Sequence, residues 1–202
     1  MKKFFLLALA GFYSLTFMAE KAQAQTGHRS GSSAAEGTFG IGTSVLNLGV
    51  GFASRYDYGT GLLGGGSSVS PAFSLSYERG VASLGPGVLG VGGYVGYQRA
   101  SYDLGGSDKW SYSDVFVTVR GAYHLPVATG FDVYAGLGLG LRHDGVSFSG
   151  STLLGGDASA GATDLVASVF AGGRYFFTPK VGAFAEIGYD QTYLKAGLSV
   201  KF

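Results

Sequence analysis

The amino-acid sequence predicts an all-β fold, namely a transmembrane antiparallel up-and-down β-barrel of eight strands that follows a signal peptide. Three observations lead to this prediction. Apolar and polar side chains alternate in segment after segment of the chain, as they do in strands that separate two different surroundings. Glycine makes up 37 of the 202 residues without a collagen-like period. Only 13% of the residues are charged, about half the usual share in a soluble protein.

The first 24 residues are typical of a secretory signal peptide. Lys2 and Lys3 supply the positive start, an apolar stretch follows, and an A-x-A cleavage motif ends at Ala24. The alternative is a helical membrane anchor, which needs about 20 apolar residues, and this stretch is shorter. We therefore expect a signal peptide over residues 1–24 that is removed on export.

The rest of the chain is expected to contain a flexible lead and one barrel. Residues 25–38 are small, polar and aperiodic, which predicts a flexible segment, and the barrel is expected over 39–202. Its eight alternating segments are 46–52, 73–77, 89–97, 115–123, 131–141, 165–175, 181–189 and 193–202. Tilted strands of about ten residues are long enough to cross the hydrocarbon of a bilayer.

Three further features favour lipid over a protein core on the apolar side, because a soluble sandwich would show the same alternation. The long connections 55–69, 102–113 and 142–164 would all lie at one end, as extracellular loops do. Aromatic residues of the apolar row gather near the segment ends, as at lipid interfaces: Phe52, Tyr97 and Tyr189 at one end, and Tyr77, Tyr123, Phe131, Tyr175, Phe177 and Phe202 at the other. The charged residues lie on the opposite row. Strands in lipid must close into a barrel, because an open edge would leave backbone groups unpaired.

The A-x-A signal, the eight alternating segments and the terminal "GLSVKF" resemble the small outer-membrane β-barrel family of Gram-negative bacteria, of the OmpA/OmpX type. The resemblance covers essentially the whole chain after the signal peptide. It implies a place in the outer membrane, among its lipids and lipopolysaccharide. In that family the last strand is read by the barrel-assembly machinery. The resemblance therefore implies an assembly signal in the last apolar row, at Leu194, Leu198, Val200 and Phe202.

The polar row should fill the interior, because eight strands leave room only for side chains or one small ligand. Its large members are Tyr94, Phe116, Tyr134, Phe170, Phe176 and Phe184. If the last two segments turn tightly at 190–191, Glu186 lies opposite Lys195, with Arg174 diagonal to them. Buried charges persist only when paired. We therefore predict a lumen ion network of Arg174, Glu186 and Lys195.

Motifs for chemistry are weak in this sequence. "GPGVLG" at 85–90 matches a nucleotide-binding pattern, but another strand follows where that pattern requires a helix. His143, beside Asp144 and near Ser147, has the residue types of an acyl-transfer site. Lipid A-modifying enzymes exist among small outer-membrane barrels, but the deacylase pattern of His, one residue, then Ser-Asn is absent. We expect no enzyme, no cofactor and no metal site. A net charge of +1 gives no sign of a nucleic-acid partner.

Two functions from different classes remain open. The leading hypothesis is a structural or interaction protein, with a mostly plugged lumen, that presents its extracellular loops to a partner the sequence does not identify. The alternative is a narrow porin-like channel for small or hydrophobic solutes, favoured by the glycines that line 89–97 and 131–141. A lipid A-modifying enzyme is the third and weakest hypothesis.

Overall fold

The computed structural model describes residues 38–55, 66–105, 108–150 and 157–202. The strands in this part of the chain are β1 (Ser44–Ser54), β2 (Gly66–Val69), β3 (Ala72–Leu84), β4 (Gly87–Gly105), β5 (Asp108–Ala128), β6 (Phe131–Ser149), β7 (Ala158–Phe176), β8 (Val181–Tyr189) and β9 (Thr192–Lys201). The predicted signal peptide and nearly all of the predicted flexible segment lie outside the described residues.

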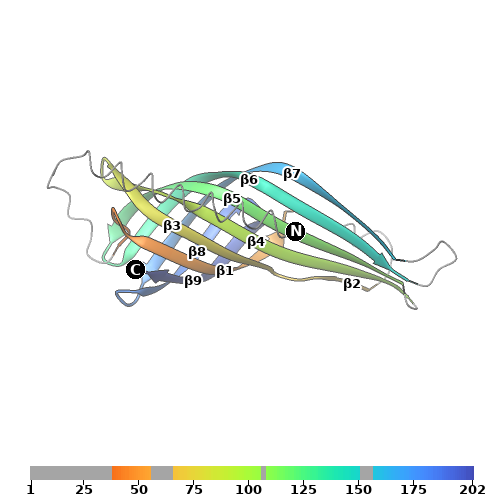
Figure 1. The fold of residues 1–202 in the computed structure, drawn as a ribbon. Helices are drawn as coiled ribbons and strands as arrows, with labels where there is room; N and C mark the ends of the chain where they lie inside the picture. The colour runs from red at the N-terminus through yellow and green to blue at the C-terminus, as the bar shows by residue number, and fades with distance from the viewer. Residues whose placement is uncertain (1–37, 56–65, 106–107, 151–156) are drawn as a thin grey trace.

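The strands close into an antiparallel ring (Figure 1). Its order is β1, β3, β4, β5, β6, β7, β8 and β9, and β9 pairs back with β1. The short β2 is the continuation of β3 along the same neighbour, because both pair with β4 and only Ser70 and Pro71 separate them. The prediction of an all-β barrel is confirmed, with eight strand positions around the ring when β2 is counted with β3.

The alternation of side chains settles which face is inside. Every predicted apolar row faces outward, and large members such as Leu48, Leu137 and Leu165 are 62%, 67% and 74% exposed. The six aromatic residues predicted for the interior are all buried, with Phe116 completely so. So large an exposed apolar surface does not occur on a soluble monomer. It forms a belt around the ring that faces lipid, and this belt is the membrane-spanning part of the barrel. The described part of the chain contains no helix long and apolar enough to cross a membrane.

The two ends of the barrel differ. At one end lie three short turns, each bounded by strands: 85–86, 129–130 and 177–180. The chain terminus lies at the same end, where Ser44 N donates to Phe202 O at 3.0 Å. Glycine serves two of these turns, because Gly85 and Gly130 have φ of 59° and 72°, which other residues adopt at a cost. We call this the short-turn end. The opposite, loop end holds the connections 55–65, 106–107, 150–157 and 190–191.

Four strands rise far above the others at the loop end (Figure 1). β4, β6 and β7 have 19 residues each and β5 has 21, whereas β1, β8 and β9 have 11, 9 and 10. The pairing of β7 with β8 therefore stops at Val169 and Tyr189, while β7 and β6 stay paired as far as Ala158. We call β2 and the outer parts of these four strands, 99–105, 108–113, 143–149 and 158–164, the projecting sheet.

The projecting sheet corrects the expected loops. Among the described residues, 102–105, 108–113, 142–149 and 158–164 are strand, and 66–69 of the first expected loop is β2. Alternation continues in these stretches, but the apolar side chains change to the inner face: Tyr102, Trp110, Tyr112, Val146 and Phe148 all occupy inward positions. The outward apolar rows end where this change occurs. The strand residues beyond it therefore have the pattern that is expected of loops.

Candidate functional site: a charged lumen beneath a projecting sheet

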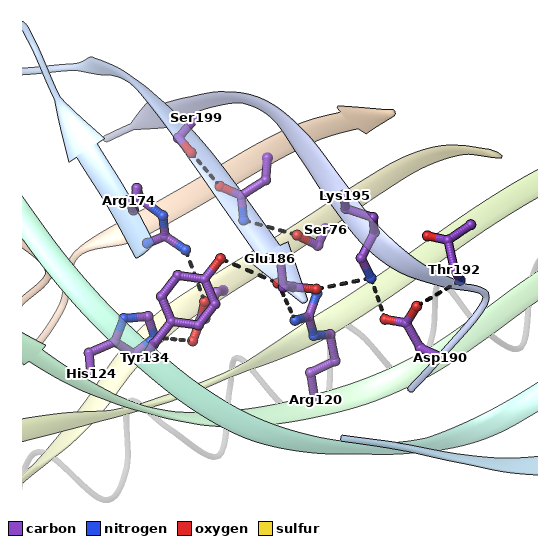
Figure 2. Close-up of polar contacts among 12 residues, drawn as sticks. Ser76, Arg120, His124, Tyr134, Arg174, Glu186, Asp190, Thr192, Lys195 and Ser199 are labelled. Carbon is purple, nitrogen blue, oxygen red and sulfur yellow. Dashed lines mark hydrogen bonds and ion pairs between the residues drawn. The ribbon is translucent and has the colours of Figure 1, made fainter. Parts of the chain in front are cut away.

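The middle of the lumen is closed by an ion network centred on Glu186 of β8 (Figure 2). Its carboxylate accepts a hydrogen bond from Arg120 Nη2 at 2.7 Å and forms an ion pair with Lys195 Nζ at 2.9 Å. The Tyr134 hydroxyl donates to the same carboxylate at 3.3 Å. Lys195 also pairs with the carboxylate of Asp190. Two cations and two anions thus neutralise one another where little water reaches them.

Local structure explains this arrangement. β8 and β9 are joined by the tight turn at 190–191, so the antiparallel register sets Glu186 opposite Lys195. The turn also fixes Asp190, whose Oδ1 accepts a hydrogen bond from Thr192 N at 3.1 Å. Arg120 comes from β5, which is not a neighbour of β8 in the ring, and its guanidinium lies 3.5 Å from the ring centre of Phe170. The network therefore connects strands that are not neighbours in the ring, across the lumen.

A second network fills the lumen nearer the short-turn end. His124 of β5 has Nδ1 at 2.7 Å from Asp132 Oδ2 and Nε2 at 2.5 Å from Glu78 Oε1. Because each ring nitrogen faces a carboxylate oxygen, the doubly protonated imidazolium satisfies both contacts as donor. Arg174 Nη2 lies 3.4 Å from Glu78 Oε2 and completes the balance of two cations and two anions.

Two aromatic rings pack against this imidazole. The ring of Tyr134 stacks on it with ring centres 5.0 Å apart. The ring of Phe39 is tilted relative to the imidazole, and their ring centres are 4.1 Å apart. Phe39 precedes β1 and is completely buried, so the chain enters the barrel by placing a ring inside its short-turn end. Rings against a cation add attraction beyond the area they bury. Side chains thus fill the lumen at this end as well as in its middle.

The glycines of the polar row make room for these rings. A Cβ added at Gly136 would lie 2.5 Å from Phe170 Cζ, one at Gly172 would lie 2.8 Å from Tyr134 Cζ, and one at Gly49 would lie 2.9 Å from Phe184 Cζ. Such approaches are far closer than van der Waals contact. The glycine-lined strands therefore hold neighbouring side chains rather than an open path, a large-against-small fit typical of small barrels.

The predicted lumen residues fall into two groups. The structure brings Glu186 and Lys195 together, but it places Arg174 with Glu78 of the second network. Sequence reasoning missed five partners: Glu78, Arg120, His124, Asp132 and Asp190. The polar parity of the first four is a signal for an inward position. Which inward charges meet across the lumen depends on the stagger of the barrel, which a period of two does not contain.

The predicted assembly row lies where its parity puts it, on the outward face. Leu194, Leu198, Val200 and Phe202 are all exposed at the surface of the belt. The Phe202 ring lies at the short-turn end, 6.4 Å from the ring of Tyr77. An interfacial aromatic is suited to fix the depth of the last strand. The role of these residues in assembly stays a prediction.

The residue types of an acyl-transfer site are not brought together. His143 and Ser147 point outward from β6, and His143 Nδ1 lies 2.8 Å from Thr163 Oγ1. Asp144 points to the opposite face of the strand, toward Arg142, so it does not orient the histidine. The stretch 85–90 forms a turn and the start of β4 without a helix. In the described part of the chain, no group of three or more His, Cys, Asp or Glu residues could hold a metal ion.

The projecting sheet reverses the polarity of the belt. Its concave, inward face carries aromatic side chains, among them Trp110 and Phe148 with ring centres 5.1 Å apart. Its convex face carries polar ones: Arg99, Ser101, Asp103, Lys109, Ser111, Ser113, His143, Ser147, Ser149, Ser159 and Thr163. A polar outer face is what a sheet in water requires, and an apolar outer face is what lipid requires. The change between them marks the membrane surface at the loop end.

No family model matches this chain, and neither does any curated protein. Several solved structures are similar to it, among them the following three. One is Ail, the attachment invasion locus protein of Yersinia pestis, in complex with the heparin analogue sucrose octasulfate, at 16% identity and a TM-score of 0.48 over 80% of this chain and 99% of that one. The second is the N-terminal β-barrel domain of Pseudomonas aeruginosa OprF, at 14% identity and 0.45 over 81% and 99%. The third is Neisserial surface protein A, at 18% and 0.37 over 79% and 95%.

Proposed function

We propose that this protein is an integral outer-membrane β-barrel whose sealed lumen makes it a rigid base, and whose projecting sheet is its interaction surface outside the membrane. The observation that carries this proposal is the reversal of polarity along β4 to β7. It supports a membrane boundary that crosses these strands and leaves their outer parts in water. Export requires a signal peptide, which is expected at 1–24, and insertion into such a membrane requires an outward apolar belt.

The side chains that fill the lumen favour a rigid structural base over a channel. Most of the buried charges of the lumen are paired in the two networks, a further ion pair joins Arg142 to Asp114, and rings of neighbouring strands fill the space beside the inward glycines. A solute would have to separate these ion pairs in surroundings that water hardly reaches, and each broken pair would leave uncompensated charges. This disfavours the narrow channel, for which the glycine-lined strands were the argument.

The projecting sheet supports an interaction role because it is regular strand rather than irregular loop. Its pairing holds side chains at fixed spacing, which keeps the ordering cost of binding low. Exposed aromatic residues such as Trp110 are over-represented at sites of protein contact.

Conductance tests the sealed base. The folded mature chain is placed in a planar bilayer, with a large general porin as the positive control. We expect no steady, reproducible channels from the pure protein. Regular conductance steps that scale with the amount of protein would reject the sealed lumen and establish the channel instead.

Cysteine labelling tests the placement in the membrane, because the chain contains no natural cysteine. We expect a membrane-impermeant maleimide to label Ser111→Cys on intact cells, and to leave Leu139→Cys in the belt unlabelled. Thr178→Cys, at the short-turn end, serves as the matched control and should react only after the outer membrane is permeabilised. Labelling of Thr178→Cys on intact cells, with Ser111→Cys protected, would invert the proposed orientation.

A further inference from the structure

The projecting sheet ends at β7 in a long edge with which no described strand pairs. Between Ala158 and Ser168, β7 pairs with β6 on one side, and no strand in the described part of the chain pairs with its other side. At the opposite margin of the sheet the outermost strand is β2, which has only four residues and pairs with β4 from Ala100 to Asp103. An open edge presents a row of backbone donors and acceptors ready to pair with another strand. Figure 1 shows β7 at the margin of the projecting strands.

This edge lacks the features that keep natural edges apart. Such edges are usually short, bulged, or marked by lysine or proline. The outer part of β7, Ala158–Asp164, has the sequence "ASAGATD". Its one charged residue is Asp164, at the end nearer the belt. Its register with β6 shows no irregularity, and its side chains are exposed. Nothing in its geometry or side chains hinders the approach of a further strand.

We propose that the outer edge of β7 pairs, strand to strand and antiparallel, with the same edge of a second copy of this chain in a facing membrane. The proposal rests on the proposed function, because it needs the projecting sheet to stand outside the membrane. Strand addition draws its affinity from the backbone and its selectivity from pockets for side chains. An edge of alanine, serine and glycine offers no pockets. It therefore suits a flat partner of equally small residues, and the edge itself is such a partner.

The edge is self-complementary when the two copies are centred on Gly161. Ala160 then lies opposite Ala162 of the second copy, and Ser159 lies opposite its Thr163. Asp164 lies opposite Ala158, so the two carboxylates stand at opposite ends of the paired region. Like charges directly opposite one another would weaken the pairing, and this register avoids them.

Symmetry explains why the partner stands in a facing membrane. Antiparallel neighbours are related by a two-fold axis perpendicular to their sheet. The projecting sheet stands on the membrane, so this axis lies parallel to the membrane, and the second barrel is inverted relative to the first. Two copies in one membrane would instead be related by an axis along the membrane normal. That axis sets the same residue of both copies at one level, where N–H meets N–H.

Paired charge variants test the proposal in vesicles that carry the full mature chain. Ala160→Lys/Ala162→Lys places lysine opposite lysine twice in the proposed register, and Ala160→Glu/Ala162→Glu does the same with glutamate. We expect parent vesicles to cluster, each variant alone to lose clustering, and a mixture of the two variants to regain it through Lys–Glu pairs. Ser147→Lys/Ser149→Lys, on the convex face of β6, adds the same charge away from the edge and should cluster like the parent.

Failure of this proposal is distinguishable from failure of the proposed function. Parent vesicles that stay apart, or variant mixtures that do not recover, would overturn the pairing of β7, while conductance and labelling still decide the sealed base. Equal clustering of all variants would place self-association on another surface and would also overturn it. A synthetic peptide of residues 157–165 provides a check that needs no folded variant. It should abolish clustering of parent vesicles, and a scrambled peptide should not.

Discussion

Four strands, β4 to β7, run through both the belt and the projecting sheet, yet they place their apolar side chains on opposite faces in the two regions. In the belt, lipid lies outside and paired charges lie inside. In the projecting sheet, water lies outside and aromatic rings line the inner face. The hydrogen-bond ladder runs through the change without a break in β6 and β7. The comparison shows that the strand period is a property of the backbone, whereas the choice of apolar face is dictated by the surrounding solvent.

The two regions also differ in what they do with charge. Glu186 is 3% exposed and keeps its charge because Arg120 and Lys195 compensate it. Asp164, in the projecting sheet, is exposed and lies in water. A carboxylate thus contributes to stability in one region through its partners and in the other hardly at all.

The largest expected effect is the loss of one partner from the lumen network. Glu186→Ala should lower the free energy of unfolding by about 3–5 kcal/mol, because it leaves Arg120 and Lys195 with too few anions in a buried site. Glu186→Ala/Lys195→Ala should cost less than the single change, since it removes a cation with the anion. Unfolding by urea in lipid vesicles measures both. Asp164→Ala is the matched control and should stay within about 0.5 kcal/mol of the parent. Equal or additive losses would contradict a coupled network.

A charge on the outer face gives the next largest contrast. Leu137→Arg, in the belt, should cost about 2–4 kcal/mol, because it places a cation against hydrocarbon. Ser147→Arg lies on the same strand and the same outward row, but in the projecting sheet, and should change the free energy of unfolding by about 0.5 kcal/mol at most. The same unfolding experiment compares them. Similar costs for both would mean that the belt does not end where the polarity reverses.

The smallest effect on stability concerns the two ends of the barrel. Deletion of Phe202 should cost only about 1 kcal/mol of unfolding free energy. Its side chain is 66% exposed, and the two backbone hydrogen bonds that it exchanges with Ser44 lie at the very end of the strand. It should nevertheless lower the amount of barrel in the outer membrane, as the resemblance to assembly-signal strands implies. Deletion within 150–156, at the loop end, should leave that amount unchanged, since connections accept length changes cheaply. Cell fractionation with the heat-dependent gel shift of folded barrels measures both. Normal insertion without Phe202 would refute the assembly signal.

Much of the fold could be predicted from the sequence because a barrel repeats one local rule. The outward rows, the inward aromatics and the turn at 190–191 all follow from alternation and turn-forming residues. The height of the projecting sheet did not follow, because its apolar side changes face and its outer row is rich in serine. This row has the composition of a loop and the conformation of a strand.

The lumen shows where local rules stop. Glu186 and Lys195 meet across one tight turn, a contact that register alone specifies. Arg120 reaches Glu186 from a strand that is not its neighbour, and His124 lies between Glu78 and Asp132, of which Glu78 is distant in sequence. These contacts depend on barrel stagger and on rotamers. Phe39 was missed for another reason, since it precedes the first strand and belongs to no alternating row.

The hairpin construction of the projecting sheet bears on how such a chain can vary in length. β4 with β5, and β6 with β7, each form a two-stranded arm joined at its tip. One residue added to each strand of an arm, next to the tip, raises that arm and preserves every pair below it. An unmatched residue added to one strand lower down would turn all side chains beyond it to the other face. Natural variants should therefore grow or shrink by symmetrical steps at the tips, and each arm can change height independently while the membrane-spanning part stays the same.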